Sequence, residues 1–529
     1  MDRHPRPLPA AALVFGALLM GCAAEADTPG LPTIDLSGGP AFPLDAHLES
    51  GDIAAGKYSF DELFDAGGDL FHTPYNGLDG VGIARLPDGT ALARFSVPPT
   101  GNGGGGMVSS QSCGECHNMP HGAAAGLAST DRAGDPDGDG HPPFLQRSTT
   151  SLWGDGILQL LAQEMTEELQ ATRDEVARMA SEQPEHAVER SLTAKGVSFG
   201  AIAATAGANG EVQFDLTGVE GVAPDLVVRP LLWKGNVPTV RMVMVGAAAG
   251  LMGMQAEEAL WFPPPGREYD PDPDGDGVER ELSVGDITAL TIYSAAQETP
   301  HSVQHLANLG MVEMPDAETL ARIERGRAVF ASVGCASCHV PEMHLQNTVF
   351  EEPTTRGNGH YYSRRLVERD VGYDPERPVR FDLLADAQEP RVEPHPEGGA
   401  IVRLYGDLKR HHMGRQLSDV PSRQTTATAN GGPLVIEGDT VLIEPTEFLT
   451  PELWGVGSTG PWLHDARAGT LAEAVLLHGE DEPPPVGDAG RSEAQESRDA
   501  FQALPEGDQE ALLTFLRSLR LYEPPREDT

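Results

Sequence analysis

Two pentapeptides carry the strongest chemical signal in this sequence: Cys113-Gly-Glu-Cys116-His117 and Cys335-Ala-Ser-Cys338-His339. Both match Cys-x-x-Cys-His, the attachment pattern of a c-type haem. In that chemistry each thiol bonds to one vinyl group of the porphyrin, and the adjacent histidine ligates the iron from the proximal side. A Cys-x-x-Cys pair can also bind structural zinc or act as a redox pair. The histidine that directly follows both pairs favours two covalent haems.

The cysteine count supports this interpretation. The chain has five cysteines, and the two motifs use four of them. Only Cys22 remains, so no pair is left for a disulfide or for a separate zinc cluster.

The segment around Cys22 predicts export. Arg3 and Arg6 precede an apolar run over residues 8–20, which is too short for a membrane span and has the form of a signal-peptide core. The run ends in Leu19-Met-Gly-Cys22, which is similar to a bacterial lipobox. This predicts cleavage before Cys22 and lipid attachment to its thiol, on the periplasmic side of a bacterial membrane. The alternative is ordinary secretion of a soluble periplasmic protein; c-type haems are attached outside the cytoplasm in either case.

The overall charge narrows the range of partners. A chain of 529 residues should hold two or more domains, and its formal net charge is −43. Such an acidic surface argues against binding nucleic acid or anionic lipid headgroups. It would suit a basic redox partner protein, although solubility alone also explains it.

An acidic segment, 270–281, matches the pattern of a calcium-binding loop. Asp270, Asp272 and Asp274 fall at loop positions 1, 3 and 5, and Glu281 falls at position 12. Asp276 would join the ligands if the register began two residues later. Without a cation these aspartates would repel one another. A solvated acidic linker is the alternative.

The elements that must position these motifs are mostly helical. Apolar periodicity predicts helices over 152–179, 237–254, 286–296 and 317–333, the last running directly into the second motif. A threonine cap and a proline break predict further helices over 470–478, 494–504 and 506–520. Alternation predicts strands near 91–97 and 212–216. The two motifs lie far apart in the sequence, so each is expected to anchor its own domain.

Several segments beside the two motifs together resemble the bacterial di-haem cytochrome c peroxidase superfamily, in particular its di-haem oxidoreductase branch. The resemblance covers roughly residues 60–522. It depends on these segments: Gly68-Asp-Leu-Phe71, Cys116-His-Asn-Met-Pro120, Arg147-Ser-Thr-Thr-Ser-Leu-Trp153, Trp233-Lys-Gly-Asn-Val-Pro-Thr-Val-Arg241, His412-Met413-Gly414 and Leu463-His464-Asp465-Ala-Arg467.

The resemblance implies a mostly α-helical fold, with two cytochrome c-like haem domains, long loops and a few short β-strands. Mapped onto this chain, it gives an N-terminal haem domain (58–300) and a C-terminal haem domain (301–522). Before them come the signal peptide (1–22) and a segment rich in Gly, Pro, Ala and Asp that is expected to be a flexible tether (23–57), and a tail (523–529) follows. The family also holds calcium between its domains, where 270–281 would lie, and is often dimeric, which implies a homodimer.

The resemblance also implies the ligands of the second haem. His339 and Met413 would be its axial pair, and a thioether opposite an imidazole raises the reduction potential of the iron. His411 and His412 are rival ligands. The proximal ligand of the first haem is His117.

The distal side of the first haem stays open at this stage. His121 is too close to its motif to cross the ring, and His141 lies in an acidic loop. A carboxylate is needed to move a proton between peroxide oxygens, and Glu164 is the candidate. Trp153 would help electrons pass between the haems, or else is a core aromatic residue. The family often has an acid where this chain has Gln159.

The function that these features imply is reduction of hydrogen peroxide to water by an exported di-haem cytochrome. A small cytochrome or cupredoxin would supply the electrons. Two alternatives share the scaffold: an oxygenase or oxidase acting on an organic or protein substrate, and an electron-transfer cytochrome without catalytic activity. Fold-level resemblance alone does not choose among the three.

Overall fold

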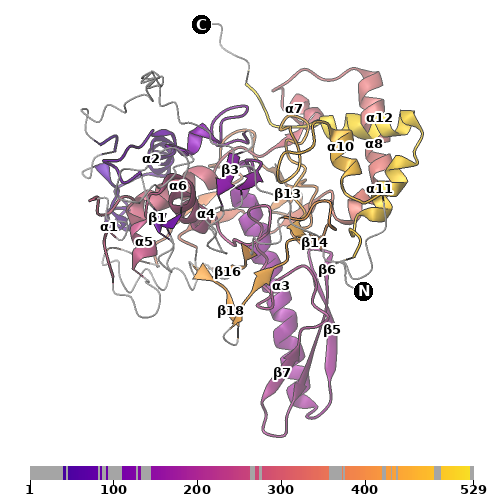
Figure 1. Ribbon diagram of the computed structural model, residues 1–529, viewed down its shortest axis with the longest axis horizontal. Coiled ribbons are helices and arrows are strands. Elements are labelled where there is room, and N and C mark those ends of the chain that lie inside the picture. Colours follow the sequence, from indigo (N-terminus) through magenta and orange to yellow (C-terminus); the bar gives the residue numbers. More distant parts are fainter. Residues whose placement is uncertain are drawn as a thin grey trace, which may run out of the picture. The chain divides into compact units, whose positions relative to one another are not determined.

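Figure 1 shows the computed structural model, in which Gly39–Thr529 forms one compact unit by its contacts. This unit includes both expected haem domains, and the domain boundary expected near residue 300 stays a prediction. The structure describes residues 40–42, 46–81, 84–85, 91–92, 110–126, 129–132, 144–261, 269–272, 277–354, 356, 372, 374, 376–419, 425–429, 432–436, 439–481 and 490–524. The lipobox with Cys22 lies outside these residues, and within them no helix is long and apolar enough to cross a membrane.

A buried helix organises the first half of the chain. α6 (Val284–Ala295) has every residue buried, and the side chain of Ser283 caps its N-terminus together with Asp286. α2 (Phe60–His72) packs against α6 and starts with the same kind of capping box, formed by Ser59 and Glu62. Each cap contributes about 1 kcal/mol by satisfying backbone N–H groups that have no helical partner.

Regular structure starts closer to the N-terminus than the sequence suggested. α1 (Ser50–Ala54) lies inside the segment 23–57 that was expected to be a tether. Just before α1, the backbone N–H of Leu48 donates to the buried carboxylate of Asp286, at 2.9 Å. This bond attaches the segment to the end of α6, so the tether prediction is wrong for the residues next to α1.

The longest helix starts in the core. α3 (Asp155–Glu182) is buried along its first third and packs its later turns against a three-stranded antiparallel sheet. The sheet consists of β5 (Val188–Ala194), β6 (Val197–Ala206) and β7 (Val212–Asp215), in that order. Figure 1 shows α3 running alongside these strands. The helix prediction over 152–179 and the strand prediction near 212–216 are confirmed.

The apolar segment 237–254 is helical, as predicted. α4 (Val240–Ala247) continues directly into a wider π-helical turn, η4 (Ala248–Met252). Its Met244, Met252 and Met254 are buried in the main hydrophobic cluster, where methionine fills core space. α5 (Glu257–Leu260) follows.

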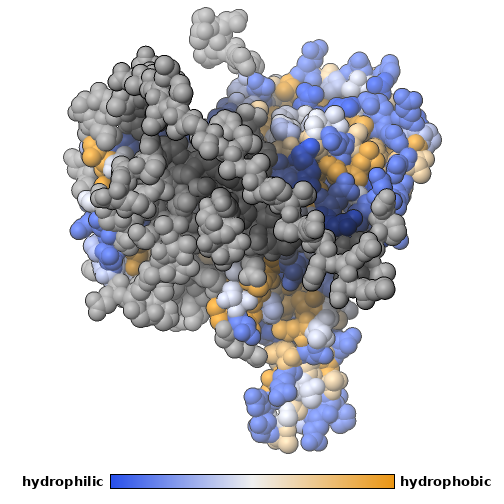
Figure 2. Space-filling model, viewed as in Figure 1, coloured by the Kyte–Doolittle hydropathy of each residue, from blue (hydrophilic) through white to orange (hydrophobic). Residues whose placement is uncertain are grey.

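A second hydrophobic cluster forms around the helices of the second half. α8 (Ala317–Ser332) packs against α12 (Glu506–Arg517) through side chains such as Phe330 and Phe515, whose rings lie 5.4 Å apart. α7 (Val303–Asn308), α10 (Leu471–Leu476) and α11 (Gln495–Gln502) complete this region. The predicted helices and the threonine cap at Thr470 are confirmed. Figure 2 shows mostly hydrophilic residues on the surface of this region.

Short strands are more frequent than predicted. Some, such as β8 with β22 and β14 with β21, pair with a partner far away in the chain, and others form tight hairpins. Strands of two or three residues are too short for local periodicity to reveal. The mostly α-helical fold class is therefore only partly right. The remaining strands are β1 (Ala84–Arg85), β2 (Ala91–Leu92), β3 (Ser129–Arg132), β4 (Phe144–Arg147), β8 (His301–Ser302), β9 (Met343–Leu345), β10 (Val349–Glu352), β11 (Val379–Asp382), β12 (Glu393–Pro394), β13 (Ala400–Val402), β14 (Arg410–His412), β15 (Thr425–Thr426), β16 (Thr428–Ala429), β17 (Gly432–Pro433), β18 (Val435–Ile436), β19 (Asp439–Thr440), β20 (Leu442–Ile443), β21 (Glu447–Leu449) and β22 (Leu519–Arg520).

Candidate functional site

Both Cys-x-x-Cys-His motifs fold into the same turn. The first forms the 3-10 turn η3 (Cys113–Glu115) and the second forms η5 (Cys335–Ser337). In each, the backbone N–H of the histidine donates to the carbonyl of the first cysteine at 3.0 Å. Two segments far apart in the sequence thus present their thiols and imidazole in one local conformation.

The two motif histidines are oriented in the same way as well. Nδ1 of His117 lies 3.1 Å from the carbonyl oxygen of Ala124, and Nδ1 of His339 lies 2.9 Å from that of Tyr405. A carbonyl can only accept, so Nδ1 carries the proton and the lone pair is on Nε2. Burial lowers the pKa of both imidazoles to about 4, which keeps them neutral. A neutral ring fixed through Nδ1 is the usual state of a histidine that ligates a metal through Nε2.

The thiols fit haem attachment better than structural zinc. None of the four motif cysteines forms a disulfide. Burial raises the pKa of Cys113 to about 12 and that of Cys335 to about 11, so both are held as neutral thiols. Structural zinc is held by ligands that converge on one point, and within the described residues the two cysteines and the histidine of neither motif form such a group.

One cavity of about 500 Å³ reaches both motifs. From the first motif it is lined by Cys116 and His117, and from the second by Cys335, Cys338 and His339. Three motif thiols and two neutral imidazoles on a shared cavity fit two covalently attached haems. The second motif and the end of α8 contribute one part of the lining. Val243 and Ala247 of α4 and Leu251 of η4 contribute another part.

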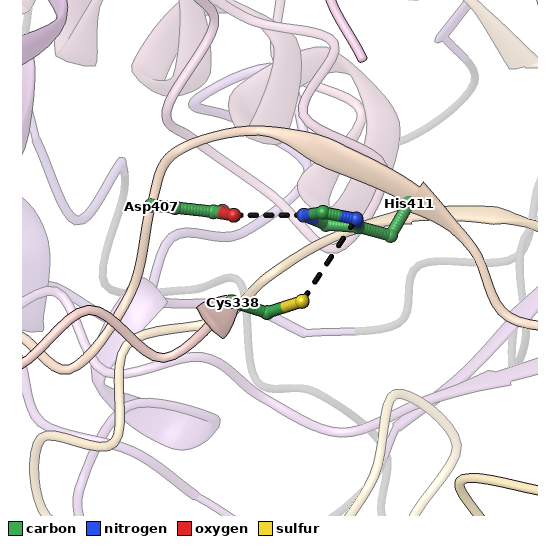
Figure 3. Close-up of side chains that lie close together, drawn as sticks. All are labelled: Cys338, Asp407 and His411. Carbon is green, nitrogen blue, oxygen red and sulfur yellow. Dashed lines mark hydrogen bonds and ion pairs between the residues drawn. The ribbon is translucent and has the colours of Figure 1, made fainter. Parts of the chain in front are cut away.

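His411 lies between Asp407 and Cys338 (Figure 3), and a second carboxylate, that of Glu493, also contacts its ring. Nε2 of His411 lies 2.7 Å from Asp407, and Nδ1 lies 2.7 Å from Glu493 and 4.0 Å from the sulfur of Cys338. Burial alone would lower the pKa of His411, but bonds to Asp407, Cys338 and Glu493 outweigh it and raise the pKa to about 12. The ring is an imidazolium in this arrangement, with no lone pair for a metal. Its role is to neutralise two acids and fix β14, which leads to Met413.

Two further side chains that could ligate a metal line the same cavity as His339. Met413, the predicted axial ligand, lies directly after β14 and lines the cavity, which leaves its role as a ligand a prediction. His478 lines it too, and its Nδ1 donates to the carbonyl of Ala474 at 2.8 Å, which leaves Nε2 unprotonated. Burial lowers the pKa of His339, and the nearby His478 acts in the same direction, so these two imidazoles lie close together. His478 is therefore a rival axial ligand that the sequence did not single out.

Glu164 does not reach the cavity. Its carboxylate accepts from the backbone N–H groups of Gln346 and Asn347 and forms a buried ion pair with Lys195 at 2.6 Å. These partners occupy the buried carboxylate, which joins α3 to β5–β6 and to the segment after β9. The assignment of Glu164 as the acid–base group is not supported by this placement.

Trp153 is a core residue beside the first motif. It is 1% exposed, and its indole N–H donates to the carbonyl of Gly122 at 3.2 Å. Its ring lies 4.8 Å from that of His121 and is not part of the cavity lining. The placement fits an aromatic anchor and gives no support to a role in electron transfer.

The calcium prediction is not tested in full, because Asp274 and Asp276 lie outside the described residues. His141, the candidate distal ligand of the first haem, lies outside them too. Of the described candidates, Asp270 and Asp272 bond to backbone N–H groups of their own loop. Glu281 is buried and accepts from the backbone N–H of Gln255 at 2.7 Å. Within the described part of the chain, Asp270, Asp272 and Glu281 do not form a metal-ligating group.

Comparison with known proteins leaves the family open. No family model matches the chain, and no curated protein matches it. Among solved structures, a MauG-like protein associated with microbial copper homeostasis shares 16% identity at a TM-score of 0.27, over 60% of this chain and 78% of that one. Hydrazine synthase from Kuenenia stuttgartiensis shares 14% identity at a TM-score of 0.31, over 86% of this chain and 92% of that one. Likeness this weak does not identify a reaction, so the function is argued from the site.

The cavity also contains charged groups that the sequence did not reveal. Arg147 forms a two-pronged ion pair with the buried carboxylate of Asp419, at 2.9 and 2.7 Å, and Lys234 lies 3.7 Å from the same carboxylate. Two further acids, Asp155 and Glu452, line the cavity. Asp155 follows a helix-starting glycine and Glu452 follows a proline, so both resemble ordinary turn residues in the sequence.

Proposed function

We propose that this protein is an exported c-type cytochrome with two covalent haems, ligated by His117 and His339, and that it acts as an oxidoreductase. One observation carries the proposal: both motif histidines meet the same cavity as neutral rings with Nδ1 bonded to a backbone carbonyl. Haem iron with an exchangeable axial position supplies one-electron chemistry and activation of peroxide or dioxygen. The protein supplies attachment, axial ligands and a shielded cavity.

The substrate that we propose is hydrogen peroxide, reduced to two waters by two electrons and two protons. A shared cavity supports this choice, because the two electrons would be stored close to one site. The net charge of −43 and the hydrophilic surface around α8 and α12 suit a basic donor, such as a small cytochrome or cupredoxin.

A second candidate is oxidation of an organic substrate. It is favoured by the apolar side chains of Val243, Ala247 and Leu251, which line the cavity next to one another on one helix. Such a surface would bind an apolar molecule, whereas peroxide needs only polar contacts.

The test starts with the holoprotein expressed with its export signal. We expect two haems per chain by haemochrome assay, one in the variant with Cys113 and Cys116 changed to Ala, and one in the variant with Cys335 and Cys338 changed to Ala. An EPR and optical titration then follows oxidised, half-reduced and reduced protein, with peroxide added at each stage. Reaction with peroxide after half-reduction, and turnover with a reduced donor, support the peroxidase.

The outcomes separate the candidates. Two haems that stay low-spin and inert to peroxide at every stage would refute the peroxidase and favour an electron carrier. Turnover of an apolar substrate, with no oxidation of the reduced donor when peroxide is added, would favour the oxidase. The membrane anchor at Cys22 is a separate proposal, checked by comparing membrane retention of the wild type and Cys22→Ser.

A further inference from the structure

A tyrosine and a histidine form a polar pair beside the first motif. Tyr293 lies on α6 and is 9% exposed, and His72 is the exposed last residue of α2. The phenol oxygen of Tyr293 lies 3.1 Å from Nε2 of His72. Neither side chain lines the cavity described above, so the pair is a separate feature of this motif.

Two glycines let this pair pack on the backbone of the motif. Gly114 lies between the two cysteines, and a Cβ there would lie 2.5 Å from Nδ1 of His72. A Cβ at Gly122, shortly after the motif, would lie 3.0 Å from Nε2 of His72 and 3.3 Å from the phenol oxygen of Tyr293. The absence of side chains at both glycines allows this close approach. The pair therefore lies directly against the segment that would hold the first haem.

One aromatic ring, that of Phe71, links Tyr293 to the proximal ligand of the first haem. Its centroid lies 5.1 Å from the ring of Tyr293 and 6.1 Å from the ring of His117. Phe71 is fully buried, so these rings are packed without solvent between them. An electron that leaves Tyr293 thus has a short route to the iron ligand.

The partner of the phenol decides where its proton can go. Burial raises the pKa of Tyr293 to about 12, so the phenol keeps its proton at neutral pH. If the ring lost an electron alone, a positive charge would remain in the core, which costs free energy. Nε2 of His72 can take the proton, because a neutral imidazole has one unprotonated nitrogen. The charge then lies on an exposed imidazole, and the buried ring stays neutral.

A second buried tyrosine lies near the motif but has a different partner. Tyr75 is 1% exposed, and its backbone N–H donates to the carbonyl of Gln111, just before the motif, at 3.0 Å. Its phenol donates to the carbonyl of Leu70 at 2.9 Å. A carbonyl accepts a hydrogen bond but does not take up a proton at neutral pH. Of these two tyrosines, Tyr293 is therefore the one whose partner can take the proton.

We propose that Tyr293 supplies one electron to the haem attached at Cys113 and Cys116, and that His72 takes the phenolic proton. The proposal rests on the proposed reduction of peroxide, and it adds the source of one electron to that reaction. Hydrogen peroxide takes two electrons and two solvent protons, its O–O bond breaks, and two waters form. One electron comes from Tyr293 and the other from the reduced donor protein.

The step on the protein side is the breaking of the phenolic O–H bond. The electron passes towards the haem, the proton passes to Nε2 of His72, and a neutral tyrosyl radical remains at Tyr293. The exposed imidazolium then releases its proton to solvent. A second electron from the donor protein and a solvent proton restore the phenol, so the pair returns to its starting state after each turnover.

The first test looks for the radical. The holoprotein is mixed with hydrogen peroxide, frozen within milliseconds and examined by EPR. We expect an organic radical whose hyperfine pattern changes when the protein is grown with ring-deuterated tyrosine. Tyr293→Phe removes the hydroxyl group but keeps the ring, and should abolish the signal. Tyr75→Phe is the matched control and should keep it. Haem content and circular dichroism check that each variant folds.

The second test concerns the proton acceptor. A glutamine side chain can hydrogen-bond to the phenol but cannot take its proton, so His72→Gln should slow formation of the radical. Loss of a positioned acid–base group costs about 100- to 10,000-fold in rate, and we expect a decrease of this size. Because Tyr293 and His72 are probed by separate variants, misfolding of one leaves the other decisive.

A third measurement does not depend on peroxide. A photo-excited ruthenium complex with a sacrificial electron acceptor oxidises the holoprotein directly, and EPR again reports which tyrosine loses an electron. We expect a radical that is lost in Tyr293→Phe and kept in Tyr75→Phe.

The outcomes distinguish this proposal from the function on which it rests. A protein that reduces peroxide, but shows no tyrosyl radical or keeps the radical in Tyr293→Phe, refutes the role of the pair alone. A protein that is inert to peroxide refutes the proposed function and the electron donation with it, even if photo-oxidation gives the radical at Tyr293. Loss of the peroxide-induced radical in Tyr293→Phe, its slow formation in His72→Gln and its persistence in Tyr75→Phe together support the proposal.

Discussion

Replacing Gly126 with alanine tests the geometry of the first motif. Gly126 is buried, and a Cβ added there would lie 1.6 Å from the carbonyl oxygen of Cys116. The neighbouring carbonyl of Ala125 accepts from the backbone N–H groups of Asn118 and Met119, at 3.1 and 2.8 Å. This segment therefore runs directly against the turn that presents His117.

The size of the effect follows from that separation. Real Cβ atoms essentially never come closer than 3.0 Å to such an atom, so one backbone must move by about 1.4 Å. The clash is with a backbone atom, so relief by a side-chain rotation is excluded. Overpacking of this kind costs about 1–3 kcal/mol. A displacement of about 1 Å at a reactive site can cost a hundredfold in rate.

The measurement is denaturant unfolding of the holoprotein, with haem stoichiometry and EPR on the same samples. We expect Gly126→Ala to lower the free energy of unfolding by about 1–3 kcal/mol and to alter or lose the haem at His117. The haem at His339 should keep its spectrum. Gly246→Ala is the control: this glycine lies in α4 with open space around it, so the substitution should be neutral or stabilise by up to about 1 kcal/mol.

A Gly126→Ala protein with two haems, unchanged EPR and stability within about 0.5 kcal/mol of the wild type would refute the packing of this segment on the motif. If Gly126→Ala and Gly246→Ala lowered the free energy of unfolding equally, this packing would be refuted too. The effect would then come from the added methyl group in general and not from a clash at Gly126.

Three further predictions concern the rest of the site and the core. Met413→Leu should abolish the methionine–iron charge-transfer band and lower the potential of the second haem, with His478→Leu unchanged; the opposite result assigns His478 as the ligand. Burial raises the pKa of Glu352 to about 7, so the folded state holds this proton more tightly than the unfolded chain. The free energy of unfolding should therefore fall by up to about 3 kcal/mol as the pH rises from about 4.5 through 7, and Glu352→Gln should flatten the decline in pH-dependent denaturation. Asp419→Ala should cost about 3–5 kcal/mol, because it leaves Arg147 and Lys234 buried without their carboxylate; Asp419→Asn should recover part of this, and a loss below about 1 kcal/mol would contradict the ion pair.

The sequence predicted the parts of the site that depend on neighbouring residues. The helix over 317–333, which runs into the second motif, could be predicted because its periodicity and its cap at Asp316 are local features. The same holds for the cap at Thr470 and the break at Pro505. Short strands such as β14 and β21 were missed, because they depend on a partner far away in the chain.

The position of Glu164 away from the cavity was hidden from the sequence for the same reason. Glu164 and Asp155 lie on one helix, nine residues apart, and sequence alone does not tell which turn faces a cavity. In the structure, backbone N–H groups of Gln346 and Asn347 approach the turn of Glu164, and the loop that holds Trp454 approaches that of Asp155. Both approaches are made by segments that follow the second motif. Which acid of this helix lines the cavity therefore depends on tertiary packing that no local pattern encodes.

The same contacts bear on how independent the two halves are. The segment after the first motif is fixed by groups from the second half: Arg147 pairs with Asp419, and the backbone N–H of Ser148 donates to the carbonyl of His464 at 2.8 Å. Arg147 and Asp419 are 13% and 1% exposed, so separating them would leave a buried charge on each side. A fragment ending near residue 300 would keep Cys113, Cys116 and His117 but lose these partners and part of the cavity lining. The first motif could still attach a haem, because attachment needs only the pentapeptide, yet the cavity that gives the haem its surroundings requires both halves. Whatever reaction occurs there is a property of the whole compact unit.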